Sequence, residues 1–215
     1  MSTEEAIRSV LVVVAAYVIG SIPFGVVVAR LSGGIDPRTI GSGRTGGANT
    51  MRAIGPRLAL VAGLLDMCKG VAAVLLAGWI AAGTGVEVVA AMAAVIGHSR
   101  SMFLGFGGGR GVAPAFGATL AFSPIVALLI LPVFAGVILV SRYSSLGSLS
   151  GAAFGGLLMA LQTYMVPLDP WMYVWAVAGT GLVWLFHWDN IGRLLAGKER
   201  KIGAPRPATE PPAEG

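Results

Sequence analysis

The chain has 215 residues, of which 55% are hydrophobic and only 12% are charged, and its formal net charge is +5. A soluble globular protein carries about 25% charged residues, so this chain has too little polar surface to be soluble, and its composition indicates a membrane protein. A basic balance can indicate nucleic acid binding, but the cations here flank apolar runs. They favour membrane lipid or a phosphorylated substrate as the partner, and we expect no nucleic acid partner.

The apolar residues predict an all-α polytopic membrane protein with about seven transmembrane helices, one of them half-length. A bilayer core needs roughly 20 apolar residues per helix. The apolar segments are 6–29, 58–82, 86–96, 112–122, 125–140, 147–166 and 171–186. We expect Pro23 to kink the first helix and Ser123-Pro124 to end the half-length fourth. Asp66 and Lys69 lie three apart in the second, which predicts an ion pair or a pocket contact.

The cations predict how this bundle lies in the membrane. With seven helices, every Lys and Arg except Arg8 and Lys69 lies in or beside 31–56, 98–111, 141–146 or the C-terminal tail, all on one side. The connections on the other side contain none. The positive-inside rule therefore predicts an outside N-terminus, a cytoplasmic C-terminus and cytoplasmic glycine-rich loops in the cell (inner) membrane. We expect one membrane domain, 1–202, and a disordered Pro-rich cytoplasmic tail, 203–215.

The first polar segment on this side, residues 33–52, is rich in glycine and contains Ser42, Asn49 and Arg52. Glycine lets backbone N–H groups approach an anion closely. A Ser hydroxyl can donate a hydrogen bond, and an Arg side chain can hold phosphate through its planar fork. The same composition is typical of a flexible, solvated loop, so both interpretations stay open.

The second polar segment contains Gly107-Gly108-Gly109-Arg110-Gly111 and leads into the apolar segment 112–122. It is neither a P-loop nor a dinucleotide-binding fingerprint. Consecutive glycine amides and a cation at the start of a helix predict an anion-binding nest. The alternative is a close-packing motif between helices, which Arg110 argues against, because a cation at membrane depth is costly unless an anion meets it.

The third polar segment, residues 187–193, contains His187 and Asn190, which share a helix face if the helix 171–186 continues. A His at the end of a helix is more often a cap or interface residue than a catalyst. A short polar loop, residues 142–148, adds Ser145 on the same side. Two histidines and one cysteine give no metal-ligand spacing, so we expect no metal and no cofactor.

Taken in order, these segments resemble the bacterial glycerol-3-phosphate 1-acyltransferases that use acyl phosphate, the PlsY family. The resemblance covers nearly the whole chain. Each motif alone is weak, but the ordered set is specific. The motifs are residues 21–25, the Gly-Ser-Gly…Asn…Arg loop, Asp66 with Lys69-Gly70, and residues 108–112, 142–148 and 187–197.

The resemblance implies that the chain transfers a fatty acyl group from acyl phosphate to the C1 hydroxyl of glycerol-3-phosphate. The products would be lysophosphatidic acid and phosphate, in the first step of phospholipid synthesis. Matching positions imply catalytic roles for His187, Arg110 and Asn190. They imply substrate contacts for Ser42, Asn49, Arg52, Gly108, Gly109, Gly111 and Ser145. The proton acceptor would be either His187 or the substrate's own phosphate.

Several positions depart from the family pattern. Arg110 stands where the family usually has Lys, and the other departures are Arg44, Ala48, Ser101, Gly107 and Pro114. These changes leave open an altered donor or acceptor, or a non-catalytic relative that binds anionic lipid. A transporter of a phosphorylated solute is the remaining alternative, because short and broken helices are typical of transporters.

Overall fold

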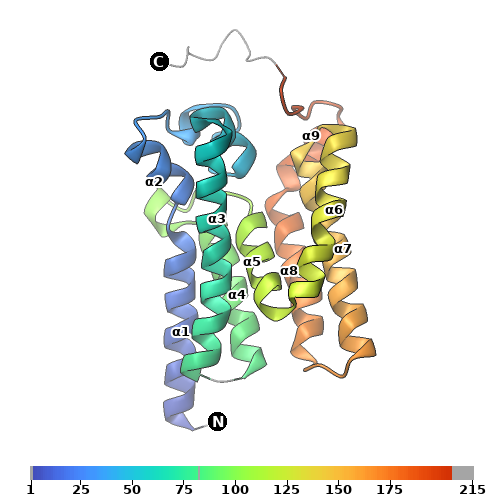
Figure 1. The fold of residues 1–215 in the computed structure, drawn as a ribbon. Coiled ribbons are helices and arrows are strands. Elements are labelled where there is room, and N and C mark those ends of the chain that lie inside the picture. The colour runs from blue at the N-terminus through green and yellow to red at the C-terminus, as the bar shows by residue number, and fades with distance from the viewer. Residues whose placement is uncertain (1, 82, 205–215) are drawn as a thin grey trace.

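The computed structural model describes residues 2–81 and 83–204, and this part of the chain is all-helical, which confirms the predicted class (Figure 1). Two short 3-10 helices, η1 (Pro37–Thr39) and η2 (Met102–Leu104), lie in the loops. The α-helices are α1 (Thr3–Ser21), α2 (Phe24–Leu31), α3 (Gly47–Ala81), α4 (Thr84–Ser99), α5 (Val112–Phe122), α6 (Pro124–Ser141), α7 (Ser144–Met165), α8 (Trp171–Phe186) and α9 (Trp188–Leu195). The predicted disordered tail falls outside the described residues from position 205 onward.

Each of the seven predicted apolar segments contains a helix, with α1 and α2 together making the first. Among the described residues, α3, α6 and α7 are each long and apolar enough to cross a membrane, and the bent pair α1 and α2 adds a fourth span. The helices α4, α5 and α8 are apolar but shorter. The half-length fourth segment is therefore found as predicted, whereas the number of crossings and the orientation stay predictions.

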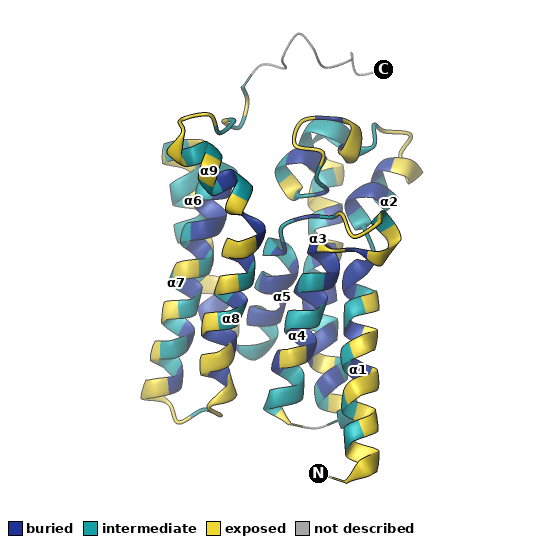
Figure 2. Ribbon diagram, turned by 180° about the vertical axis from the view of Figure 1, so that it is seen from behind, coloured by how far each residue is buried: buried dark blue, intermediate teal, exposed yellow. Residues whose placement is uncertain are grey.

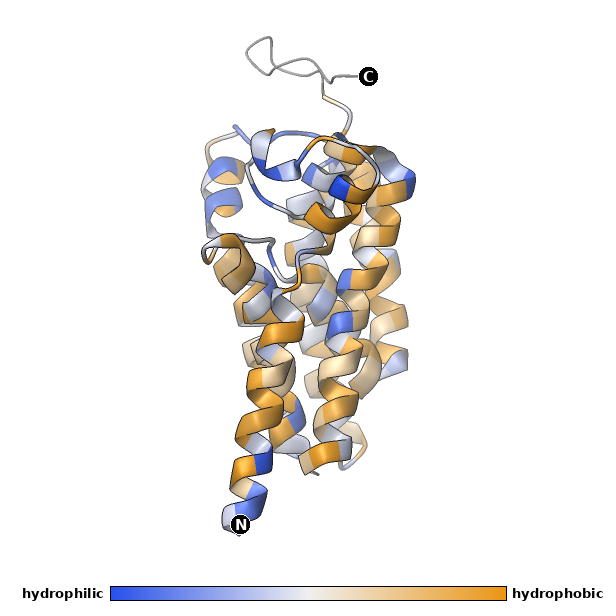
Figure 3. Cartoon of the chain, turned by 90° about the vertical axis from the view of Figure 1, so that its left-hand side faces the viewer, coloured by the Kyte–Doolittle hydropathy of each residue, from blue (hydrophilic) through white to orange (hydrophobic). Residues whose placement is uncertain are grey.

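The outer surface of the bundle is apolar, as a lipid-facing surface should be. Leu139, Val140 and Val177 are 80%, 89% and 75% exposed, and apolar colour covers the body of the bundle in Figure 3. The buried faces of the helices turn inward (Figure 2). A soluble protein rarely exposes apolar surface on this scale.

The predicted polar segments gather at one end of the bundle. Figure 1 places α2, the first turns of α3, α9 and the end of the described chain at this end, opposite the N-terminus. We call it the polar end. The connections between α3 and α4 and between α7 and α8 lie at the opposite end.

A break between α1 and α2 at Pro23 confirms the predicted kink, and the two helices meet at a bend of 42°. Backbone carbonyls freed at such a break need partners. Lys69 Nζ supplies them, since it donates to the carbonyls of Gly20 (2.9 Å) and Ile22 (2.8 Å). The same ammonium pairs with Asp66 at 2.7 Å, which confirms the expected ion pair.

Close contact between α3 and α5 sets the depth of the half-length helix. A Cβ atom on Gly70 would lie 2.0 Å from the carbonyl oxygen of Pro114, and one on Gly117 would lie 2.0 Å from that of Met67. Small residues allow such approach between membrane helices. Because α5 begins directly after Gly111, this packing also fixes the position of Arg110.

The predicted loop 31–56 contains more structure than its composition suggests. It includes η1 and the first turns of α3, which break at Gly55, where φ is 77° and a side chain would be strained. Helix α9 was also not predicted. The chain does not continue straight from α8, because His187 takes a non-helical conformation between the two helices.

Candidate active site

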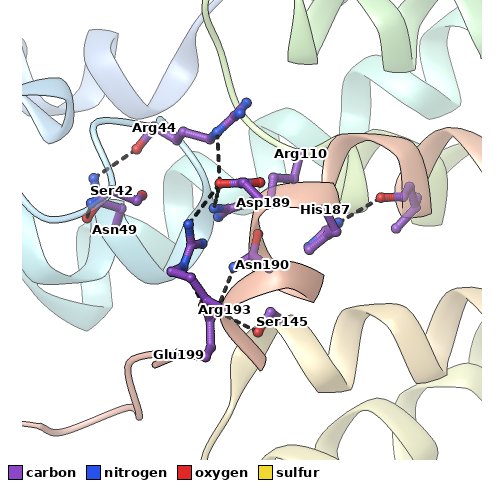
Figure 4. A network of polar contacts seen from close by, with 11 residues as sticks. Ser42, Arg44, Asn49, Arg110, Ser145, His187, Asp189, Asn190, Arg193 and Glu199 are labelled. Atoms are coloured by element: carbon purple, nitrogen blue, oxygen red, sulfur yellow. Dashed lines mark hydrogen bonds and ion pairs between the residues drawn. The ribbon is translucent and has the colours of Figure 1, made fainter. Parts of the chain in front are cut away.

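The three predicted polar segments meet at one carboxylate, that of Asp189 (Figure 4). Its Oδ2 atom lies 3.7 Å from Arg44 Nε, 3.2 Å from Arg110 and 3.2 Å from Arg193. Arg44 comes from the first segment, Arg110 from the second, and Asp189 and Arg193 from α9. Segments far apart in the sequence thus form one cationic cluster at the polar end.

A second carboxylate, Glu199, ties the short polar loop to this cluster. It accepts hydrogen bonds from Ser145 Oγ (2.7 Å), Asn190 Nδ2 (2.6 Å) and Arg193 Nε (2.7 Å). Burial alone would raise the pKa of Glu199, but these three hydrogen bonds outweigh it and hold the pKa below its ordinary value. Ser145 and Asn190, both predicted site residues, therefore converge on one anionic group.

The guanidinium groups keep Asp189 ionised in the same way. Burial would raise its pKa, but Arg110 and Arg44 act electrostatically, and Arg193 and Arg110 donate hydrogen bonds, so that the pKa lies below its ordinary value. Within the described part of the chain, Arg110 Nε and Asn190 Oδ1 are buried without a hydrogen-bond partner. Buried polar atoms usually have partners, so a ligand with both donors and acceptors would suit this position.

His187 is buried at the junction of α8 and α9, 2% exposed. Its Nδ1 atom lies 2.8 Å from the carbonyl oxygen of Val183, so Nδ1 carries the hydrogen and Nε2 is left as an acceptor. Burial, helped by the nearby Arg110, outweighs the hydrogen bond to Val183 and lowers the pKa of His187 to about 4. The imidazole is therefore neutral at physiological pH.

The first segment is held by Asn49 rather than left flexible. Its buried Nδ2 donates to the carbonyls of Pro37, Ile40 and Arg44, and its Oδ1 accepts from the backbone N–H of Ser42. This geometry makes Asn49 the residue that shapes the loop around Ser42 and Arg44. These contacts speak against a flexible loop, although Gly41, Ser42 and Gly43 are exposed to solvent.

Arg52 extends from the first turns of α3 toward the same loop. A Cβ atom on Gly41 would lie 3.8 Å from Arg52 Nη1 and 2.3 Å from Asn49 Oδ1. The loop approaches Arg110 as well, since a Cβ atom on Gly46 would lie 3.9 Å from Arg110 Nη1. Ser42 therefore belongs to the loop beside the cluster, and Arg52 on α3 lies against that loop.

The glycines around Arg110 do not form the predicted nest in full. The N–H of Gly107 donates to Leu104 and that of Gly109 donates to His98 (3.0 Å), so these two amides are not available to an anion. A Cβ atom added to Gly108 would lie 2.3 Å from the carbonyl oxygen of His98, and one added to Gly109 would lie 2.1 Å from His98 Nε2. These glycines let the loop pack closely against the end of α4, as the close-packing alternative predicts. Arg110 still supplies the positive charge that the nest prediction assigned to it.

A cavity of about 460 Å³ runs from the arginine cluster into the bundle. Gly46, Arg110, Ser145 and His187 line it near the polar end, and Thr119, Met159 and Trp175 line its deep end. Between them the lining is mainly apolar. Leu60 on α3 and Leu131 on α6 also line the cavity and are 63% and 44% exposed, so it opens sideways at these residues. The cavity is polar at one end and apolar along its length.

Sequence reasoning named Ser42, Arg110, Ser145, His187 and Asn190, and the structure brings these side chains into one neighbourhood (Figure 4). It missed the organising roles of Asp189 and Glu199. An acidic residue amid predicted phosphate-binding cations was the only available signal for Asp189. Glu199 lies in the run Lys198-Glu199-Arg200-Lys201, whose composition is typical of a solvated surface.

The family profile described as glycerol-3-phosphate acyltransferase matches residues 10–197. Glycerol-3-phosphate acyltransferase 3 from Dehalococcoides mccartyi is 41% identical, over 91% of this chain and 96% of the relative. Glycerol-3-phosphate acyltransferase 2 from Moorella thermoacetica is 43% identical, over 90% and 97%.

Two solved structures resemble the fold over almost its whole length. The crystal structure of PlsY, an integral membrane glycerol 3-phosphate acyltransferase, in its glycerol 3-phosphate form has a TM-score of 0.81 and 35% identity, and covers 91% of this chain and 96% of its own. The lysophosphatidic acid form has a TM-score of 0.80 and 34% identity, with coverage of 91% and 95%. This chain is therefore a multi-pass membrane protein that belongs to the glycerol-3-phosphate acyltransferase family.

Proposed function

We propose that this protein transfers a fatty acyl group from acyl phosphate to the 1-hydroxyl of glycerol-3-phosphate, giving lysophosphatidic acid and phosphate. The observation that carries the proposal is an arginine cluster at the mouth of a mainly apolar cavity. Acyl phosphate has the same division, with a phosphate at one end and a hydrocarbon chain at the other. Family membership supports the acceptor, glycerol-3-phosphate.

The cationic cluster offsets the main electrostatic obstacle to this reaction, which is the repulsion between two negatively charged, phosphorylated substrates. Three guanidinium groups surround Asp189, so that cations exceed anions even when Glu199 is counted. Arg110 Nε and Asn190 Oδ1 supply a buried donor and a buried acceptor. Preorganised charges of this kind stabilise developing charge in a transition state without reorganisation.

The remaining site residues position the substrates. Ser42, in the loop that Asn49 holds, and Arg52, on α3 beside that loop, face glycerol-3-phosphate from one side, and Ser145 faces it from the other. Gly108, Gly109 and Gly111 let the Arg110 loop lie close to α4, which keeps room for the phosphates. The activated anhydride needs orientation and charge stabilisation more than a protein nucleophile.

The proton of the attacking hydroxyl goes to a phosphate oxygen rather than to His187. A pKa of about 4 makes His187 a weak base, whereas a phosphate monoester has a second pKa of about 6. His187 Nε2 accepts a hydrogen bond from the hydroxyl and orients it. The hydroxyl oxygen then bonds to the acyl carbon, the bond from that carbon to the phosphate oxygen breaks, and inorganic phosphate leaves.

The polar end faces the cytoplasmic side of the cell (inner) membrane, where glycerol-3-phosphate is dissolved, and the seven apolar segments lie in the bilayer, with the half-length one crossing only part of it. The cations at this end support the orientation through the positive-inside rule. Cysteines introduced at Thr84 and Ala196 in a Cys68→Ser background test it. Only the cysteine at position 196 should react with an impermeant reagent in inside-out vesicles. Labelling of the cysteine at position 84 instead would show that the protein has the opposite orientation.

The activity is tested on the purified full chain in detergent, with glycerol-3-phosphate and acyl phosphate, acyl-coenzyme A or acyl carrier protein as the donor. We expect lysophosphatidic acid with acyl phosphate only, and its loss in a variant with both Arg110→Ala and His187→Ala. Product from another donor would correct the donor assignment. No product from any donor, while a known family member works alongside, would refute the proposal.

A further inference from the structure

The deep end of the cavity is closed by a packed group of side chains, Trp175, Met159 and Thr119. Trp175 is 3% exposed and Met159 is 1% exposed. The indole Nε1 of Trp175 donates to Thr119 Oγ1 at 3.2 Å, and its ring lies 5.5 Å from that of Phe122. The indole is therefore fixed on two sides rather than free to swing out of the cavity.

The indole also lies against Gly179, one turn nearer the polar end. A Cβ atom on Gly179 would lie 3.1 to 3.2 Å from atoms of the Trp175 ring. The ring thus fills the cavity from the level of residue 175 up to that of residue 179. A smaller side chain at position 175 would lengthen the cavity by up to one turn of α8.

The position of this closed end sets a length. His187 lies eight positions after Gly179 and twelve positions after Trp175 along α8, which at ~1.5 Å per residue gives a depth of about 12 to 18 Å. An extended chain advances about 1.2 Å per bond, since three backbone bonds span ~3.6 Å. The cavity therefore holds about 10 bonds of an extended chain with the Trp175 ring in place, and about 15 without it.

We propose that Trp175 is the residue that limits the length of the acyl chain accepted by this protein. The proposal rests on the proposed function, because the occupant of the cavity is the hydrocarbon chain of the acyl donor. The mouth supports this occupant, since Arg110 and His187 place the reacting carbonyl beside the cationic cluster and leave the chain to run toward Trp175.

The first test is Trp175→Ala, with initial rates measured for a series of saturated acyl phosphates that differ by two carbons. Removal of the ring opens one turn, ~5.4 Å, which corresponds to about four or five bonds. The chain length of the highest kcat/KM should increase by about four carbons. The ratio of rates between long and short donors is the readout, because a change in the amount of folded protein alters all donors equally.

A second variant adds a side chain to the cavity instead of removing one, so that its result does not depend on whether the protein folds without the buried Trp175 ring. Gly63 lines the cavity, and a Cβ atom added there meets no described atom within 4 Å. Gly63→Leu should fill space in the upper part of the cavity and shift the preference toward shorter donors. Gly181→Leu is the matched control, because Gly181 is exposed on α8, has the same open space and does not line the cavity.

The outcomes separate the two proposals. A wild-type chain that is inactive with every donor length refutes the proposed function. An active wild type whose length profile is unchanged in both Trp175→Ala and Gly63→Leu overturns the role of Trp175, and the cavity then holds membrane lipid or detergent rather than the donor chain. Opposite shifts in the two variants, with no shift in Gly181→Leu, support the inference.

Discussion

Replacement of Arg110 by Ala removes the cation that connects the glycine-rich loop to α9. The Arg110 side chain is 14% exposed, pairs with Asp189 at 3.2 Å and has a buried Nε without a partner among the described residues. Asp189 keeps Arg44 and Arg193 in the variant, so no carboxylate is left unpaired. The expected effect is therefore the loss of hydrogen bonds to phosphate rather than loss of the fold.

The size of the effect follows from the value of a charged hydrogen bond, ~1.5–3 kcal/mol. At 1.4 kcal/mol per tenfold change, Arg110→Ala should lower kcat/KM for glycerol-3-phosphate by about 10- to 150-fold. Arg110→Lys should retain most of the activity, because it keeps the charge and restores the residue usual in the family. The assay is the initial rate of lysophosphatidic acid formation in detergent, with glycerol-3-phosphate varied at saturating acyl phosphate.

Arg142→Ala serves as the control for this prediction. Arg142 lies at the same end of the molecule, but it donates to the carbonyl of Ile202 at 2.9 Å and not to the cluster. The control should stay within about twofold of the wild type, because surface contacts of this kind contribute little. A rate for Arg110→Ala as high as that of Arg142→Ala would refute the assignment of Arg110 to phosphate binding.

Three other substitutions test separate parts of the structure. Glu199→Gln removes an anion from the site and should lower KM for glycerol-3-phosphate; a higher KM would mean that Glu199 holds the site geometry instead. His187 has a pKa of about 4, below its ordinary value of 6.5, so below pH 6.5 the unfolded chain takes up a proton that the folded chain does not. The free energy of unfolding should therefore decrease as the pH is lowered from 6.5 to 4, with no contribution from His187 above pH 6.5. In thermal unfolding, His187→Gln should lack this contribution to the pH dependence. Asp66→Asn leaves Lys69 charged and buried, and should cost ~3–5 kcal/mol in the free energy of unfolding; an unchanged unfolding midpoint would contradict a desolvated pair.

The order of the apolar helices and the limits of some of them could be predicted because they depend on local sequence. The half-length segment 112–122 coincides with α5, and the break after it falls at Ser123, as the Ser-Pro pair indicates. The Asp66–Lys69 pair follows from the spacing of three residues on one helix. The grouping of polar segments at one end follows from the alternation of apolar runs and cationic loops.

The contacts inside the site could not be predicted, because they join residues distant in sequence. Asp189 forms ion pairs with Arg44 and Arg110 only because the loops that carry these arginines fold over α9. Glu199 reaches Ser145 because the chain turns back after α9. The nest prediction failed in part because glycine composition does not reveal which N–H groups already donate to carbonyls, as that of Gly109 does to His98.

Arg44 illustrates a limit of the family pattern. The resemblance marks it as a departure, yet its guanidinium lies 3.7 Å from Asp189 and adds a cation to the cluster. A departure in a motif is therefore not by itself a loss of function, since this one increases positive charge where the phosphates would lie.

Under the proposed function, the sideways opening beside Leu60 and Leu131 would give the two substrates separate routes. The water-soluble acceptor would come from the aqueous phase, whereas the acyl donor and the lysophospholipid product would exchange directly with the surrounding bilayer. The rate should therefore follow the mole fraction of donor in the micelle or vesicle rather than its bulk concentration. Dilution with inert lipid at constant total donor should slow the enzyme, which is the kinetic behaviour of catalysis on a surface.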